Sequence, residues 1–185
     1  MLKELKYLQS IVDELNSTNS INDKKSILSK YKNDDFLKKV LFYTYNPFYQ
    51  FYVTPKHCDK YYNDDLGNST KYNTLFELLD ALRFRKITGH AAIQSVNDFC
   101  YEYEPCRELI YKIIGKDLEI RMGDSLINKV IPGLIPSFDV ALAANFEDVE
   151  VDFENEEWYA SRKLDGCRCV TLNGVDENDI ASWSR

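Results

Sequence analysis

Apolar residues recur at intervals of three and four positions along roughly the first two thirds of the chain, which is the spacing of one helical face. The clearest case follows Asp34, a residue type that caps helix starts, and runs through residues 36–44. The same spacing predicts further helices over residues 75–82, 91–99 and 109–114. Turn-forming Gly, Asn and Pro residues separate these segments, at positions 46–47, 66–68, 88–89 and 122–124. The pattern therefore predicts a helical region from Leu2 to about Asn128.

The pattern changes at the segment IPGLIPSFD, where Pro132 and Pro136 stop any helix. Beyond it, short runs such as WYASRKL and CRCVTL are typical of strands, and DENDIASWSR predicts a turn and another strand. We therefore divide the chain into a helical domain, residues 1–132, and the opening strands of a mixed or antiparallel sheet, residues 133–185. A sheet this small needs further elements to bury its apolar face, so we expect the second domain to be incomplete.

Aromatic side chains are concentrated in the stretch FYTYNPFYQFY, residues 42–52. Such runs can stack on bases in proteins that bind single-stranded nucleic acid. More often they form the buried side of a helix, with tyrosine hydroxyls near the surface. We interpret this run in the second way.

With 185 residues, of which 44% are apolar, the chain can bury a hydrophobic core. No stretch approaches the roughly 20 apolar residues that cross a bilayer, and the first residues mix charges with leucines. We therefore expect neither a signal peptide nor a membrane span. Five widely spread cysteines without paired ligand spacing suit reduced thiols in a cytoplasm, so we expect neither a zinc site nor disulfides.

The formal net charge of −7 argues at first against a nucleic-acid partner, because Lys and Arg drive phosphate binding. The acidic residues are unevenly placed, however. Seven of the 30 lie in residues 145–157, NFEDVEVDFENEE, which hold no basic residue, and the other 23 balance the 23 Lys and Arg. Net charge therefore neither supports nor excludes binding to DNA.

The hexapeptide KLDGCR, residues 163–168, has the form K-x-D-G-x-R and lies between two predicted strands. The Lys163 amine can attack the α-phosphorus of a nucleoside triphosphate when it is unprotonated, a state that the nearby cations Arg162 and Arg168 favour. Arg168 also offers a planar donor fork for phosphate or ribose oxygens, and Asp165 can accept from the turn or the sugar. The alternative is an ordinary Asp-Gly hairpin turn flanked by solvated Lys and Arg side chains.

This hexapeptide resembles motif I of the covalent nucleotidyltransferases, which comprise DNA ligases, RNA ligases and messenger-RNA capping enzymes. The resemblance implies that Lys163 forms a phosphoramidate with the nucleotide. Ser184-Arg185 resembles the start of the next family motif, S-R-x-G, whose arginine contacts the nucleotide. The nucleotide-binding residues implied in this way are Arg162, Lys163, Asp165, Arg168 and Arg185.

Two upstream segments, ALRFRKITGHAAIQSV and GKDLEIRMGDSLINKVIPGLIP, resemble the helical DNA-binding domain of ATP-dependent DNA ligases from T-even-type bacteriophages. The resemblance covers roughly residues 35–185. RNA ligases and capping enzymes generally place the lysine much nearer the N-terminus, so DNA ligase is favoured. The fold implied is α+β: an all-helical N-terminal DNA-binding domain followed by the first strands of a truncated nucleotidyltransferase (ATP-grasp-like adenylation) domain, which begins near ALAANF.

Two helix starts, at TGHA (residues 88–91) and GDS (residues 123–125), predict exposed backbone N–H groups that can receive a phosphate. The basic residues near them are Arg83, Arg85, Lys86, Lys116, Arg121 and Lys129. The alternative is that Thr88 and Ser125 are simple caps and that the charges form a solvated face. The family resemblance favours DNA contacts, which we assign to Arg85, Lys86, Thr88, Gly89, Arg121, Gly123, Ser125 and Lys129.

The resemblance implies the N-terminal portion of a DNA ligase that seals nicks in replication, repair and recombination through a lysyl-AMP intermediate. It implies ATP and Mg²⁺ as cofactors, nicked double-stranded DNA as partner and the cytoplasm of the host cell as location. The family's later motifs are absent, so no residue is assigned to a metal, and a second polypeptide could supply them. Two alternatives stay open: a non-catalytic DNA-binding fragment of a split or truncated ligase, and an RNA ligase or capping-type enzyme.

Overall fold

The computed structural model describes residues 1–137, 146–148, 150, 152–155, 157, 159, 169–173 and 180–184. The chain divides into two compact units, Met1–Ser137 and Phe138–Arg185. The division between residues 132 and 133 that the two prolines suggested stays a prediction.

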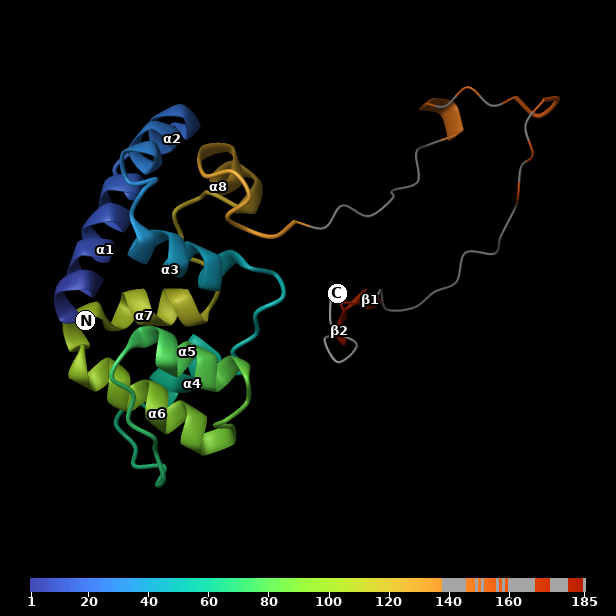
Figure 1. Cartoon of the computed structure of the whole chain (residues 1–185). Coiled ribbons are helices and arrows are strands. Elements are labelled where there is room, and N and C mark those ends of the chain that lie inside the picture. Colours follow the sequence, from blue (N-terminus) through green and yellow to red (C-terminus); the bar gives the residue numbers. More distant parts are fainter. Residues whose placement is uncertain are drawn as a thin grey trace. The chain divides into compact units, whose positions relative to one another are not determined.

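The first unit is built from helices joined by loops (Figure 1). They are α1 (Leu2–Asn16), α2 (Ile21–Lys30), α3 (Asp35–Tyr45), α4 (Pro55–Lys60), α5 (Leu75–Arg83), α6 (Gly89–Glu102), the 3₁₀ turn η1 (Glu104–Cys106), α7 (Arg107–Ile114) and α8 (Asp124–Val130). The four stretches with helical spacing correspond to α3, α5, α6 and α7. The prediction of a helical region is therefore confirmed.

Caps at the helix starts fix the loops that join these helices. Asp34 accepts a hydrogen bond from the Leu37 amide at 2.8 Å, which confirms the predicted start of α3. Helix α4 begins with Pro55 behind a Thr54 cap, because the fixed φ of proline suits a first helical turn. The chain between these two helices, residues 46–54, is called the α3–α4 loop below.

Helix α7 lies at the centre of the first unit's core (Figure 1). It packs against α3, α4 and α6. Its buried side chains are Leu109, Ile110, Tyr111, Ile113 and Ile114. Full burial of an aliphatic side chain contributes about 1.5–3 kcal/mol, so α7 supplies a large share of the stability that holds the surrounding loops in place.

One buried polar side chain, Asn97 of α6, joins three helices. Its amide donates to the Cys58 and Tyr61 carbonyls at the end of α4, at 3.0 Å each. Its carbonyl oxygen accepts from the Tyr111 hydroxyl of α7 at 3.4 Å. Asn97 therefore gives the Cys58 carbonyl and the Tyr111 hydroxyl hydrogen-bond partners that they would otherwise lack in the buried core, and it fixes α4 relative to α6 and α7.

The described part of the second unit contains the 3₁₀ turn η2 (Phe146–Asp148) and the strands β1 (Cys169–Asn173) and β2 (Ile180–Ser184). The strands pair antiparallel, with Cys169 opposite Ser184 and Asn173 opposite Ile180. Most of WYASRKL lies outside the described residues.

These observations correct the predicted fold class. The described residues are mainly helical, and the strands among them form one two-stranded hairpin. The α+β prediction, with the first strands of a nucleotidyltransferase domain, is therefore wrong. The physical reason is that short apolar runs between turn residues indicate local pairing, whereas a sheet domain needs three or more strands with a shared buried face.

Among the described residues, no helix is both long and apolar enough to span a membrane. In the same part of the chain, Cys58, Cys100 and Cys106 are buried free thiols. Burial raises the pKa of the Cys58 thiol to about 12, so this side chain stays protonated and unreactive near neutral pH.

Candidate nucleic-acid interface

Helix α5 ends in a Schellman motif whose left-handed position holds Arg85. The Lys86 amide donates to the Ala81 carbonyl at 2.8 Å, and the Arg85 amide to the Leu82 carbonyl at 3.0 Å. Arg85 has a φ of 54°, where a residue with a Cβ costs about 1 kcal/mol or more relative to glycine. Its guanidinium carbon lies 5.0 Å from the centroid of the Tyr52 ring. The strained backbone thus directs a cation toward the α3–α4 loop.

The same motif ends α7, again with a basic residue in the left-handed position. The amides of Lys116 and Asp117 donate to the carbonyls of Ile113 and Lys112, at 3.1 Å each. Lys116 has a φ of 64°. Two helices of the first unit therefore end with a cation where glycine is the usual residue.

Arg85 and Lys116 both contact the α3–α4 loop. The Lys116 ammonium donates to the Asn46 carbonyl at 2.6 Å and lies 5.6 Å from the centroid of the Phe51 ring. Arg85 covers the next aromatic residue, Tyr52. Such cation–π contacts hold the loop between the two helix ends. In Figure 1 the loop runs along the same side of the first unit as the loop between α5 and α6.

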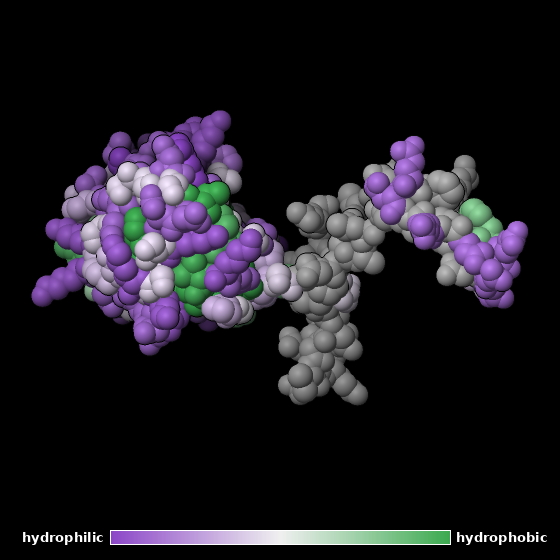
Figure 2. Space-filling model, turned by 90° about the horizontal axis from the view of Figure 1, so that it is seen from above, coloured by the Kyte–Doolittle hydropathy of each residue, from purple (hydrophilic) through white to green (hydrophobic). Residues whose placement is uncertain are grey.

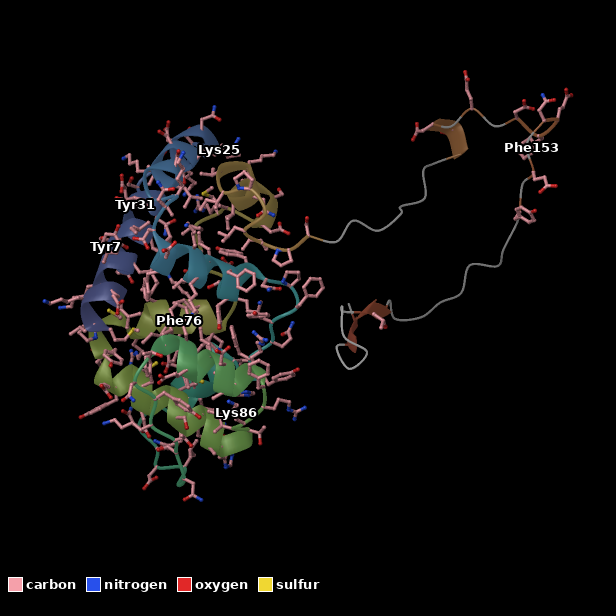
Figure 3. All side chains as sticks on the ribbon, in the orientation of Figure 1. Tyr7, Lys25, Tyr31, Phe76, Lys86 and Phe153 are labelled. Carbon is pink, nitrogen blue, oxygen red and sulfur yellow. The ribbon has the colours of Figure 1, made fainter. Side chains whose placement is uncertain are left out.

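The first group of predicted DNA-binding residues is exposed around the start of α6. Arg85 and Lys86 lie in the α5–α6 loop, and Lys86 is labelled in Figure 3. Thr88 and Gly89 begin the helix as predicted. Thr88 occupies the N-cap position, but its side chain makes no capping hydrogen bond. The simple-cap interpretation of Thr88 is therefore not supported, and its hydroxyl is available to a ligand.

The second group lies around the start of α8. Arg121 and Gly123 line a groove of about 700 Å³, together with Tyr45, Lys116, Asp117, Glu119 and Met122. The Arg121 guanidinium donates to the Asn19 side chain at 2.6 Å. Ser125 and Lys129 are exposed on α8. Because two carboxylates share the groove, this group has a mixed charge, unlike the first.

Around the α3–α4 loop and the start of α6 the sequence is free of acidic residues. Residues 46–58 and 81–97 contain no Asp or Glu, although acidic residues outnumber basic ones over the whole chain. The cations of these two stretches are Lys56, Arg83, Arg85 and Lys86. Contacts between the two stretches bring Arg83 and Arg85 against the α3–α4 loop. Lys56 instead lines a pocket with Asp59 and Glu108, so the unpaired cations of this described region are Arg85 and Lys86 at the end of α5.

Two residues that the sequence interpretation missed are Tyr52 and Phe84, which are 63% and 57% exposed. Helix α3 ends at Tyr45, so the second half of the aromatic run is a loop and not helix core. Exposure alone does not mark an interface, because hydrophobic residues also reach the surface on the face drawn in Figure 2. What distinguishes Tyr52 and Phe84 is that an arginine lies over each ring.

The chain is similar to two curated proteins over nearly its whole length. They are the DNA ligases of Enterobacteria phage T4 and Enterobacteria phage T6, each 30% identical over 183 residues that cover 95% of this chain. The resemblance to phage DNA ligases is confirmed. The chain spans 37% of the length of these ligases, and the aligned region includes most of both units. No family model matches the chain.

A comparison of folds also found a similar solved structure. The first of the similar solved structures, named "Pmar-Lig_Pre.", has a TM-score of 0.50 and 22% sequence identity, and the match covers 65% of this chain and 28% of that one. At this identity the match supports a shared fold alone.

The residues that the ligase resemblance implies for nucleotide binding are Arg162, Lys163, Asp165, Arg168 and Arg185, and all lie outside the described residues. Their roles therefore stay predictions. Within the described part of the chain, no group of three or more His, Cys, Asp or Glu residues could hold a metal ion.

Lys116 is expected to make stability depend on pH. Burial lowers the pKa of its ammonium group to about 8, below the ordinary value of an unfolded lysine. Between about pH 8 and pH 10 the unfolded chain then binds more protons at this site, so its contribution to the free energy of unfolding rises with pH. Buried Cys58 acts in the opposite direction because its pKa is raised.

Comparison with Lys116→Met isolates the lysine's part of this dependence. Urea unfolding of both proteins at intervals between pH 7.5 and 10 is the measurement. The native chain should gain stability relative to the variant as pH rises, and parallel pH profiles would contradict the expectation.

Proposed function

We propose that the chain is a portion of an ATP-dependent DNA ligase and that its first unit binds nicked duplex DNA. The observation that supports this most directly is that residues 46–58 and 81–97 contain no Asp or Glu and carry the exposed cations Arg85 and Lys86, of which Arg85 contacts the α3–α4 loop. Exposed Lys and Arg side chains bind DNA by releasing the counterions of its phosphates. The 30% identity to two phage DNA ligases supports the same conclusion independently.

In this proposal the α5–α6 loop and the start of α6 bind one stretch of the DNA backbone. Arg85 and Lys86 contact phosphates, and the Thr88 hydroxyl and Gly89 amide donate to another at the positive end of α6. None of these contacts reads a base, which suits an enzyme that must seal nicks in any sequence.

The residues near α8 form the second part of the proposed interface. Arg121, Gly123, Ser125 and Lys129 would bind a neighbouring stretch of backbone. The mixed charge of their groove suggests a smaller share of the affinity than that of the first group.

For the chemical step we propose that the unprotonated Lys163 amine attacks the α-phosphorus of ATP, which forms a phosphoramidate with AMP and releases pyrophosphate. The proposal rests on the K-x-D-G-x-R motif and on the similarity to the phage ligases. Arg162, Asp165, Arg168 and Arg185 would hold the nucleotide, and Mg²⁺ would neutralise charge on the triphosphate. Passing AMP to the 5′-phosphate of a nick in the host cytoplasm, during replication, repair or recombination, belongs to the same proposal. A second polypeptide that supplies further ligase motifs is also part of this proposal.

The experiment combines labelling and binding. The whole chain and its Lys163→Ala variant are incubated with α-labelled ATP and Mg²⁺ and separated by denaturing electrophoresis, and both are titrated into nicked duplex DNA. We expect both proteins to bind the nicked duplex and only the native chain to keep label. Binding without label would leave a DNA-binding fragment that cannot adenylate itself, and absence of both would refute the proposal.

A further inference from the structure

The Arg83 guanidinium at the end of α5 contacts two aromatic rings. The guanidinium carbon of Arg83 lies 3.8 Å from the centroid of the Tyr49 ring and 4.2 Å from that of the Phe84 ring. Both separations are within the range of cation–π contacts. Tyr49 is half-buried and Phe84 is exposed. Arg83 therefore joins a half-buried ring, Tyr49, to a solvent-exposed ring, Phe84.

Contacts with Asp80 and, through it, with Tyr43 hold the Arg83 side chain in place. The Arg83 guanidinium lies 3.9 Å from the Asp80 carboxylate, which accepts from the Tyr43 hydroxyl at 2.9 Å. Tyr43 is buried in α3. Because Arg83 is fixed in this way, the Phe84 ring has a preorganised neighbour, and a ligand that stacks on it meets a surface already ordered.

Tyr52 provides a second exposed ring of the same kind. Arg85 lies over it, and Tyr52 itself has a φ of 58°, a strained conformation for a residue with a side chain. The fold therefore accepts both backbone strain and the exposure of a large ring at this position. Backbone strain of this kind persists where the surrounding structure enforces it, and it is concentrated at functional sites.

We propose that Tyr52 and Phe84 form a stacking surface for unpaired nucleobases, so that the first unit binds single-stranded DNA as well as a duplex backbone. The argument is chemical. An exposed aromatic ring accepts any base, because every base has a π face. The absence of carboxylates from residues 46–58 and 81–97 favours a polyanionic partner. This inference extends the proposed DNA binding but needs neither a nick nor Lys163.

The test separates stacking from phosphate binding. The whole chain is titrated by fluorescence anisotropy with a labelled oligothymidylate and with an oligonucleotide of the same length and charge whose sugars carry no bases. We expect tighter binding to the oligothymidylate. Tyr52→Ala and Phe84→Ala should each weaken that binding about tenfold and leave binding to the base-free strand unchanged. Tyr52→Phe, which keeps the ring, should bind like the native chain.

Tyr101→Ala is the matched control, because Tyr101 is 77% exposed on α6 but belongs to neither loop. It should bind both strands like the native chain, and thermal melting of every variant should confirm that the fold is retained. Equal affinity for the two strands, or native binding by Tyr52→Ala and Phe84→Ala, would overturn the inference. Binding of nicked duplex by the same variants is measured in parallel and distinguishes the two proposals. If the proposed phosphate contacts are correct, Tyr52→Ala and Phe84→Ala still bind nicked duplex.

Discussion

Arg85→Gly is expected to make the protein more stable and at the same time a weaker binder of nicked DNA. Glycine removes the strain of the left-handed position, which costs a non-glycine residue about 1 kcal/mol, while loss of the exposed cation–π contact with Tyr52 offsets part of that gain. The free energy of unfolding should therefore rise by a few tenths to about 1 kcal/mol. Removal of one phosphate-binding cation should lower affinity about tenfold at moderate salt and reduce the salt slope by about one.

Arg85→Ala is the control that separates the two effects. Alanine removes the cation but keeps a Cβ in the left-handed conformation, so binding should weaken as in Arg85→Gly without any gain in stability. Urea unfolding and titration of nicked duplex at several salt concentrations give both quantities. If Arg85→Gly bound DNA as tightly as the native chain, Arg85 would have no part in the interface.

The expected gain in stability and loss of DNA affinity on Arg85→Gly give a physical reason for a basic residue, and not glycine, at the left-handed position that ends the helix. In the described part of the chain, the non-glycine residues with left-handed backbone are Tyr52, Arg85, Lys116, Glu119 and Arg121. All lie in the loops that surround the proposed interface, and three of them are basic. Strained residues persist where surrounding contacts enforce them, which here are the Schellman hydrogen bonds and the aromatic rings of the α3–α4 loop.

Features set by local sequence were predictable. The cap at Asp34, the start of α6 at Gly89 and the helical stretch of α7 each follow from a few neighbouring residues, and the structure has all three. The exposed cations of the α5–α6 loop were also among the predicted site residues. Local pattern was sufficient because a helix and its caps are formed by residues three and four positions apart.

Features that residue type does not signal, or that depend on contacts distant in sequence, were not predictable in this way. Neither Arg85 nor Lys116 is glycine, so no residue type signalled a left-handed position, and the Schellman hydrogen bonds appear only in the structure. The exposure of Tyr52 depends on where α3 ends and on a partner 33 positions away, whereas the aromatic run alone favoured helix core. The fold class failed for a related reason, because short apolar runs do not specify how many strands share a sheet.

Asn97→Ala is expected to destabilise the first unit more than any single change at its surface. The substitution leaves the Cys58 and Tyr61 carbonyls without their shared donor and the Tyr111 hydroxyl without its acceptor, in a site where Asn97 is 2% exposed. An unsatisfied buried polar group costs about 1–3 kcal/mol, and the small cavity adds to that, so a loss of about 3 kcal/mol is expected. Because α4 follows the α3–α4 loop directly, weaker anchoring of α4 also loosens the side of the unit that carries Tyr52.

Tyr111→Phe isolates the hydrogen bond between the Tyr111 hydroxyl and Asn97. It removes only the 3.4 Å hydrogen bond and leaves both donor bonds of Asn97 in place, so it should cost about 1 kcal/mol. Urea unfolding of both variants, with hydrogen exchange of the α4 amides, tests the comparison. A loss in Asn97→Ala no larger than that in Tyr111→Phe would mean that the bonds to α4 contribute little, and that the packing of α7 alone holds this side of the unit together.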